Sequence, residues 1–140
     1  MDAIVMLRED HKTVESLFKR LEKDDLSVVP DICAALTQHA FIEEEVFYPS
    51  VRAEVEGTLD DVLEAVEEHH LVKVLISELE NLDPTDETYK AKATVLMELV
   101  RHHVEEEEGE MFPQVREALG RKRLGEIGEV METAKAAAPA

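Results

Sequence analysis

Two copies of one short pattern place histidine and glutamate side chains where they could bind metal ions. The first copy runs His39-Ala-Phe-Ile-Glu43 and ends in Phe-Tyr-Pro49, and the second runs His103-Val-Glu-Glu-Glu107 and ends in Met-Phe-Pro113. At about 100° per residue, a histidine and a glutamate four positions apart lie on one face of a helix. Each copy therefore directs an imidazole and a carboxylate, two common metal ligands, from a single face.

The apolar residues around these pairs repeat in the same register. Ile32, Leu36 and Phe47 in the first copy correspond to Leu96, Val100 and Met111 in the second, each 64 positions later. The polar pairs therefore lie on the apolar faces of their helices and point into a core. A carboxylate in an apolar core is costly unless it meets a cation, so the two glutamates indicate a buried positive charge.

Two further histidines belong to a second repeat. Asp10-His11, followed by Val14, Leu17, Phe18 and Leu21, corresponds to Glu68-His69, followed by Val72, Leu75, Ile76 and Leu79, 58 positions later. His11 and His69 are thus candidate ligands on the first helix of each of two similar hairpins. His70 and His102 adjoin two candidates, but the repeat alignment favours His69 over His70 and His103 over His102.

The combined set could hold two metal ions. It consists of four imidazoles and two carboxylates, from His11, His39, Glu43, His69, His103 and Glu107. Six donors are too many for one catalytic zinc ion, but they suit two iron or manganese ions bridged by Glu43 and Glu107. The alternative is that the histidines are ordinary core residues and the glutamate runs are solvated, which the matched registers of all six residues disfavour.

Residues beside the candidates could support the site. Glu44 and Glu108 could accept hydrogen bonds from the histidines. Tyr48 is expected to pack beside Pro49, and its alternative roles are a hydrogen bond to bound oxygen or direct ligation of the metal. Because Pro49 and Pro113 lack an N–H group, we expect a kink or a brief unwinding of the helix after each pair.

Length and composition place these residues in one helical domain, 1–140. The chain is 44% hydrophobic with only 5 glycines and 5 prolines, which favours helix over sheet. Apolar periodicity predicts helices at about 2–23, 30–54, 58–82 and 85–119, with Thr85 capping the fourth, and a short helix at about 121–136. Short connections predict an all-α, up-down-up-down antiparallel four-helix bundle with a short fifth C-terminal helix.

The charge and the cysteine count exclude several classes of function. A formal charge of −18 disfavours binding to nucleic acids or anionic membranes. No apolar run is long enough to span a membrane and no basic region follows Met1, so we expect a cytoplasmic location. We also expect a monomer. Cys33 is the single cysteine, which excludes an internal disulfide and a thiolate metal site. Nitrogen and oxygen must therefore hold any metal.

These residues resemble the pattern of the hemerythrin-like, His-His-Glu cation-binding domain family. The resemblance covers nearly the whole chain and rests on His11, His39-x-x-x-Glu43, His69 and His103-x-x-x-Glu107. It implies a four-helix bundle with a non-haem di-iron centre, in which an oxo or hydroxo group and two carboxylates bridge the iron ions. The ligands it implies are these same six residues, with manganese or zinc less favoured than iron.

The chain departs from the classical oxygen carriers of that family, which use five histidines, one glutamate and one aspartate. Lys73 stands four residues after His69, where a further histidine is missing. The six-ligand variant is similar to bacterial, particularly actinobacterial, hemerythrin-like proteins linked to peroxide, nitric oxide and iron responses. The resemblance therefore implies catalase-like or peroxidase-like reaction with hydrogen peroxide, or reaction with nitric oxide, in stress defence. The alternatives are a protein that binds, senses or stores dioxygen, nitric oxide or iron without turnover, and a purely structural bundle.

Overall fold

The computed structural model describes residues 1–138, and these form helices and turns without a β-strand. The elements are α1 (Ala3–Glu22), η1 (Leu26–Val28), α2 (Val29–Ile42), η2 (Glu43–Phe47), α3 (Tyr48–Glu54), α4 (Leu59–Glu80), α5 (Tyr89–Glu106), η3 (Glu107–Met111) and α6 (Phe112–Ala136). The predicted all-α class is confirmed. None of the described helices is long and apolar enough to pass through a bilayer.

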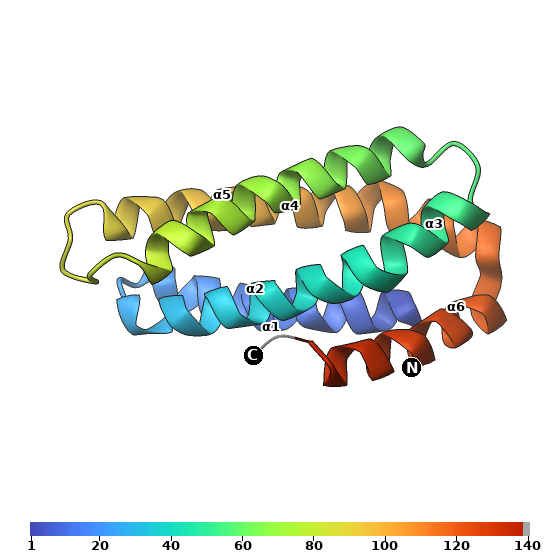
Figure 1. Ribbon diagram of the computed structural model, residues 1–140, viewed down its shortest axis with the longest axis horizontal. Coiled ribbons are helices and arrows are strands. Elements are labelled where there is room, and N and C mark those ends of the chain that lie inside the picture. The colour runs from blue at the N-terminus through green and yellow to red at the C-terminus, as the bar shows by residue number, and fades with distance from the viewer. Residues whose placement is uncertain (139–140) are drawn as a thin grey trace.

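The long helical segments run up and down beside one another (Figure 1). Helix α1 packs against α2, and α4 packs against α5. The elements α2, η2 and α3 follow one another without a break, as do α5, η3 and the start of α6. Each hairpin of the sequence repeat thus contributes two antiparallel helices to a four-helix bundle.

Two π-helical turns interrupt the long helices, one in each hairpin. They cover Glu43–Phe47 and Glu107–Met111, and a proline stands near the start of the α-helix that follows each. Proline has no N–H to donate to the carbonyl four residues earlier, so the regular i to i−4 hydrogen bonding is interrupted there. The π turn accommodates this interruption. The unwinding predicted beside each proline is therefore present, and it begins at the glutamate of each pair.

The C-terminal part of α6 covers the first hairpin. Gly120 has a φ of 74° and a ψ of 174°, a conformation that suits glycine, and the chain changes direction there (Figure 1). The predicted fifth helix follows and buries Leu124, Ile127 and Met131 in a cluster with residues of α1. At Gly128 a Cβ atom would lie 1.9 Å from the backbone oxygen of Met1, so this close approach requires glycine.

The connection before α5 is longer than the sequence predicted. The Asp83 side chain accepts the N–H of Thr85 at 2.8 Å, and the Asp86 side chain accepts the N–H of Thr88 at 2.8 Å. These side-chain bonds stabilise two successive turns in place of a helical one. Helix α5 begins at Tyr89, so the prediction of a helix from 85 capped by Thr85 is wrong.

Cys33 lies among apolar side chains between the helices and is 3% exposed. Removal from water, together with the negative charge of Glu80, raises the pKa of its thiol to about 11. Because the thiolate is the reactive form, we expect iodoacetamide at pH 8 to alkylate Cys33 at least about tenfold more slowly in the folded protein than in urea. Mass spectrometry of timed samples measures both rates. Equal rates would contradict the buried position.

Candidate metal centre

All six residues predicted to bind metal converge between the four long helices. The histidines come from four helices and the glutamates begin the two π turns: His11 on α1, His39 on α2, His69 on α4, His103 on α5, Glu43 in η2 and Glu107 in η3. Each residue is at most 7% exposed, and Glu43 is fully buried. The apolar periodicity of the helices explains this convergence, because each candidate lies on the buried face of its element.

The ligand atoms form two groups that share one carboxylate. The first group contains His11, His39, Glu43 and Glu107, and the second contains Glu43, His69 and His103. Within each group the possible ligand atoms lie within 4.8 Å of one another. Each group of nitrogen and oxygen atoms could hold a metal ion, with Glu43 between the two.

The Nε2 atoms of the histidines face the two buried carboxylates. Glu43 Oε1 lies 3.2 Å from His39 Nε2 and 3.1 Å from His69 Nε2. Glu107 Oε1 lies 3.2 Å from His11 Nε2, and its Oε2 lies 3.2 Å from His103 Nε2. Each glutamate is therefore close to one histidine from each hairpin, so the site depends on both halves of the chain.

Several of these buried atoms have no hydrogen-bond partner among the described residues. They are Nε2 of His11 and His39, both carboxylate oxygens of Glu43, and Oε1 of Glu107. The nitrogen and oxygen atoms are close enough to attract one another but are not aligned as hydrogen bonds. Unsatisfied buried carboxylate oxygens are costly, and a metal cation between them would satisfy oxygen and nitrogen together. The donor set therefore fits a metal ion, and iron suits this mixture of imidazole and carboxylate.

Each of the four histidines is hydrogen-bonded through its outer nitrogen, Nδ1, to one further carboxylate. The distances from Nδ1 to the carboxylate oxygen are 2.7 Å for His11–Glu108, 2.9 Å for His39–Asp10, 2.9 Å for His69–Glu44 and 2.6 Å for His103–Glu68. An ionised carboxylate only accepts hydrogen bonds, so each Nδ1 donates and each Nε2 is directed to the centre. This arrangement fixes the orientation of all four imidazole rings.

Two of these four outer partners were not predicted from the sequence. Glu44 and Glu108 were predicted as acceptors for the histidines, and they have that role. Asp10 and Glu68 were noted only as matching residues of the repeat, yet each binds the histidine of the neighbouring helix. Their signal was present in the sequence, because each directly precedes a candidate histidine at equivalent positions.

Charge pairing shifts the pKa of the buried groups. Burial opposes the charged form of His39, but the attraction of Glu43 and the hydrogen bond to Asp10 outweigh it and raise the pKa to about 10. Burial likewise opposes a charged His103, whose pKa nevertheless rises to about 11 beside Glu107. Burial would raise the pKa of the Glu43 carboxyl, but the His39 imidazole holds it well below its usual range. Metal ions binding to these groups must displace protons.

Tyr48 brings a phenol to the same cluster. Its side chain is 1% exposed, and its hydroxyl donates to Glu107 Oε2 and lies 3.1 Å from His103 Nε2 and 3.4 Å from His69 Nε2. Burial, reinforced by the negative charges of Glu107 and Glu43, raises the pKa of Tyr48 well above its usual value. The packing role favoured from the sequence is therefore incomplete, because the hydroxyl also contacts the candidate ligands.

The hydroxyl contact predicts a measurable cost for Tyr48→Phe. We expect the free energy of unfolding of the metal-free protein to fall by about 1.5–3 kcal/mol, the range for a hydrogen bond to a charged group. Urea unfolding followed by circular dichroism measures this change. Tyr89→Phe, at the start of α5, is the control and is expected to change stability by less than about 1 kcal/mol. Equal losses in the two variants would contradict a specific contact.

The histidines next to the candidates lie outside the buried groups. His70 is exposed and the His102 side chain is 62% exposed, whereas His69 and His103 are buried. The structure thus brings together the residues that the repeat alignment selected. Their ligation of a metal remains a prediction.

Lys73 does not join the cluster. Its Nζ lies 2.8 Å from Glu44 Oε1, and the other oxygen of Glu44 accepts the Nδ1 hydrogen bond of His69. The lysine therefore pairs with the carboxylate that orients a candidate ligand. In this chain the position four residues after His69 supports the site from outside.

A small apolar cavity touches all four buried histidines. Its volume is about 30 Å³, and its other walls are Val14, Leu36, Ala40, Val72, Val100 and Val104. About 10–15 Å³ of such volume is enough to hold one water molecule. The cavity beside the imidazoles can therefore hold a molecule of about that size.

Comparisons with known proteins found a matching sequence profile, a related sequence and a similar structure. The sequence profile described as the hemerythrin HHE cation binding domain matches residues 2–115. A DNA nickase from Nostoc sp. is 30% identical over 136 residues; the match covers 93% of this chain, and the chain spans only 38% of the length of that relative. The crystal structure of a hemerythrin HHE cation binding domain-containing protein from Mycobacterium kansasii superposes with a TM-score of 0.75 at 21% identity, covering 98% of this chain and 89% of that one.

Proposed function

This chain belongs to the hemerythrin HHE cation-binding domain family, and from that membership and its two His/Glu groups we propose that it is a di-iron protein. Glu43 and Glu107 would bridge the two ions together with an oxo or hydroxo group. The four buried histidines would complete the ligand set, with His11 and His39 in one group and His69 and His103 in the other. The unpartnered carboxylate oxygens of Glu43 carry this proposal, because a fully buried carboxylate needs a cation.

Iron held in this way would supply one-electron redox chemistry and open positions for a small oxygen-containing or nitrogen-containing molecule. The residues around the site orient the candidate ligands. The outer carboxylates keep a proton on each Nδ1, so each Nε2 is the nitrogen that can bind a metal ion once its own proton has been displaced. The Tyr48 hydroxyl is a hydrogen-bond donor next to the second group, and the valine walls of the cavity exclude bulk water.

We propose hydrogen peroxide or nitric oxide as the molecule that reacts, in catalase-like or peroxidase-like turnover or in nitric oxide removal during stress. The size of the 30 Å³ cavity supports a molecule of this class. The other candidate function is binding of dioxygen, nitric oxide or iron without turnover, which the apolar walls of the same cavity also accommodate.

The activity named for the cyanobacterial relative is not extended to this chain. The chain corresponds to 38% of that relative, so the named activity can depend on the rest of that protein. A net charge of −18 also repels DNA phosphates. A metal centre that reacts with small molecules is consistent with both observations.

The first test is metal analysis of protein expressed with ample iron, together with its visible spectrum. We expect about two iron ions per chain and charge-transfer bands from a bridged pair. An oxygen electrode then measures gas release after addition of hydrogen peroxide. Sustained release supports an enzyme, whereas a single stoichiometric spectral change supports binding without turnover. Protein that contains no iron and takes none up would contradict the proposal.

A further inference from the structure

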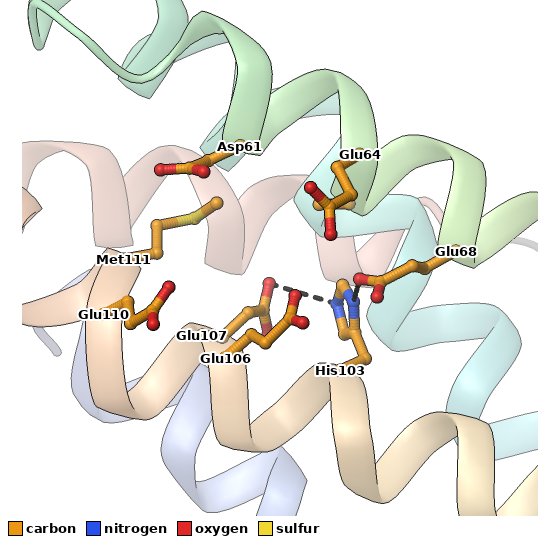
Figure 2. Close-up of a pocket in the computed structure, with 9 residues that line it drawn as sticks. Asp61, Glu64, Glu68, His103, Glu106, Glu107, Glu110 and Met111 are labelled. Atoms are coloured by element: carbon orange, nitrogen blue, oxygen red, sulfur yellow. Dashed lines mark hydrogen bonds and ion pairs between the residues drawn. The ribbon is translucent and has the colours of Figure 1, made fainter.

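An acidic pocket lies between α4 and α5 beside the metal centre (Figure 2). Its volume is about 80 Å³, and we call it the acidic pocket because six carboxylates line it: the candidate ligand Glu107 and those of Asp61, Glu64, Glu68, Glu106 and Glu110. The carboxylates of α4 and of the α5–η3 segment are directed toward one another across the gap. No lysine or arginine of the described residues lines the acidic pocket, and His103, the one basic side chain among its described lining residues, offsets only part of the negative charge.

The equivalent surface of the first hairpin is apolar and covered. By the repeat, Asp61 and Glu64 correspond to Ala3 and Met6 of α1, and Glu106 and Glu110 correspond to Ile42 and Val46. Ala3, Met6 and Ile42 are buried in one cluster with Leu124, Ile127 and Met131 of α6. The C-terminal helix therefore closes this surface on one hairpin, while the other hairpin carries carboxylates and stays open. The two sides of the site differ in access as well as in charge.

The pocket reaches residues of the metal centre itself. His103 and Glu107 line it, and Figure 2 draws the ion pairs of His103 with Glu107 and with Glu68. Glu107 is 2% exposed, and its Oε1 has no hydrogen-bond partner in the described part of the chain. A buried carboxylate with one unpartnered oxygen, at the inner side of the pocket, is a ligand for a cation that enters there. Glu68, Glu106 and the exposed His102 form a further group of possible ligand atoms at the rim.

From this geometry we infer that the acidic pocket is the access route by which divalent metal cations reach the centre. A cation is attracted by Asp61, Glu64 and Glu110, passes Glu68 and Glu106, and is transferred to Glu107 and His103. This inference rests on the proposed metal centre and adds the path to it. It concerns the rate of metal uptake and leaves the final ligands unchanged.

The physical basis is electrostatic focusing. A cleft lined by one sign of charge raises the local concentration of the opposite ion and can increase association rates by about 10 to 1,000 times. Surface charges act over roughly 10 Å at 0.1 M salt. Removing the charges of Asp61, Glu64 and Glu110, the exposed carboxylates of the acidic pocket, should therefore slow metal uptake most strongly at low salt.

The test uses metal-free protein and Co(II), whose visible absorption increases when it binds nitrogen and oxygen ligands, in a stopped-flow instrument. The pocket variant is Asp61→Asn/Glu64→Gln/Glu110→Gln, which keeps all four outer carboxylates and all six candidate ligands. The control variant, Glu87→Gln/Glu98→Gln/Glu129→Gln, removes the same charge at exposed positions outside the acidic pocket. We expect the pocket variant to take up Co(II) about tenfold more slowly at low salt and the control variant less than about twofold more slowly.

Two further measurements decide the outcome. Equilibrium stoichiometry should be the same in both variants, and the difference in rate should shrink at high salt. Equal uptake rates in the pocket and control variants would overturn the access route while leaving the metal centre intact. A pocket variant with reduced stoichiometry would overturn it too, because these residues would then hold the ions at equilibrium. If unmodified protein takes up no metal at all, the proposed function itself fails.

Discussion

Glu43→Gln is expected to remove both metal ions from the protein. The Glu43 carboxylate is the residue that belongs to both groups of ligand atoms, and it lies 3.2 Å and 3.1 Å from histidines of different hairpins. Glutamine keeps the shape of the side chain but removes the negative charge that stabilises a cation in a buried site. Elemental analysis after loading with iron should therefore give a metal content near zero, against about two per chain in unmodified protein.

Two related variants make this expectation specific. Glu45→Gln removes an exposed charge two residues away and is expected to leave the metal content unchanged. Glu107→Gln affects the four-residue group most, so we expect it to retain partial binding at Glu43, His69 and His103. Circular dichroism confirms that each variant is folded. If Glu43→Gln still bound two ions, Glu43 would not be a bridging ligand.

Phe112→Ala is expected to lower the free energy of unfolding by about 3–5 kcal/mol, the usual range for removing a buried phenylalanine side chain. The Phe112 ring is 2% exposed. It stacks on the His11 imidazole at a centroid distance of 5.9 Å and meets the Phe47 ring edge-on at 5.7 Å. Its loss would leave a cavity directly beside a candidate ligand.

Urea unfolding of metal-free protein measures this effect, because bound metal would stabilise the folded state by mass action and hide part of the loss. Phe41→Ala removes the same side chain from a half-buried position and is the matched control, with an expected cost of about 1–2 kcal/mol. A loss at Phe112 no larger than that at Phe41 would mean that the contacts of Phe112 with His11 and Phe47 do not add to the stability of the fold.

The six candidate ligands could be predicted from the sequence because their information is local. A His-x-x-x-Glu pair fixes two side chains on one helical face, and repetition in a matching apolar register fixes which face is buried. His69 could be chosen over His70 by the same argument. The helical hairpins follow from periodicity and turn residues, which are also local signals.

The remaining features depend on how helices lie relative to one another. Asp10 reaches His39, and Glu68 reaches His103, across helix pairs, so their roles depend on helix rotation that no single segment determines. The Tyr48 hydroxyl reaches the ligands only because a π turn precedes it. The start of α5 was predicted four residues early because side-chain bonds of Asp83 and Asp86 competed with the helix.

The π turns also determine where the chain can gain or lose residues. Each turn holds one residue more than the α-helical ladder would, so the residues after it have a helical phase that a regular helix of the same length would not give them. Closing the turn at Glu43–Phe47 into a regular α-helix of unchanged length would turn the residues after it by about 100°. Phe47 and Tyr48 would then leave the buried face while His39 stayed in place. Deleting one residue within the turn would instead keep their phase, whereas inserting one would change it. Each π turn is thus a place where the chain can lose one residue, but not gain one, without turning the aromatic residues away from the site.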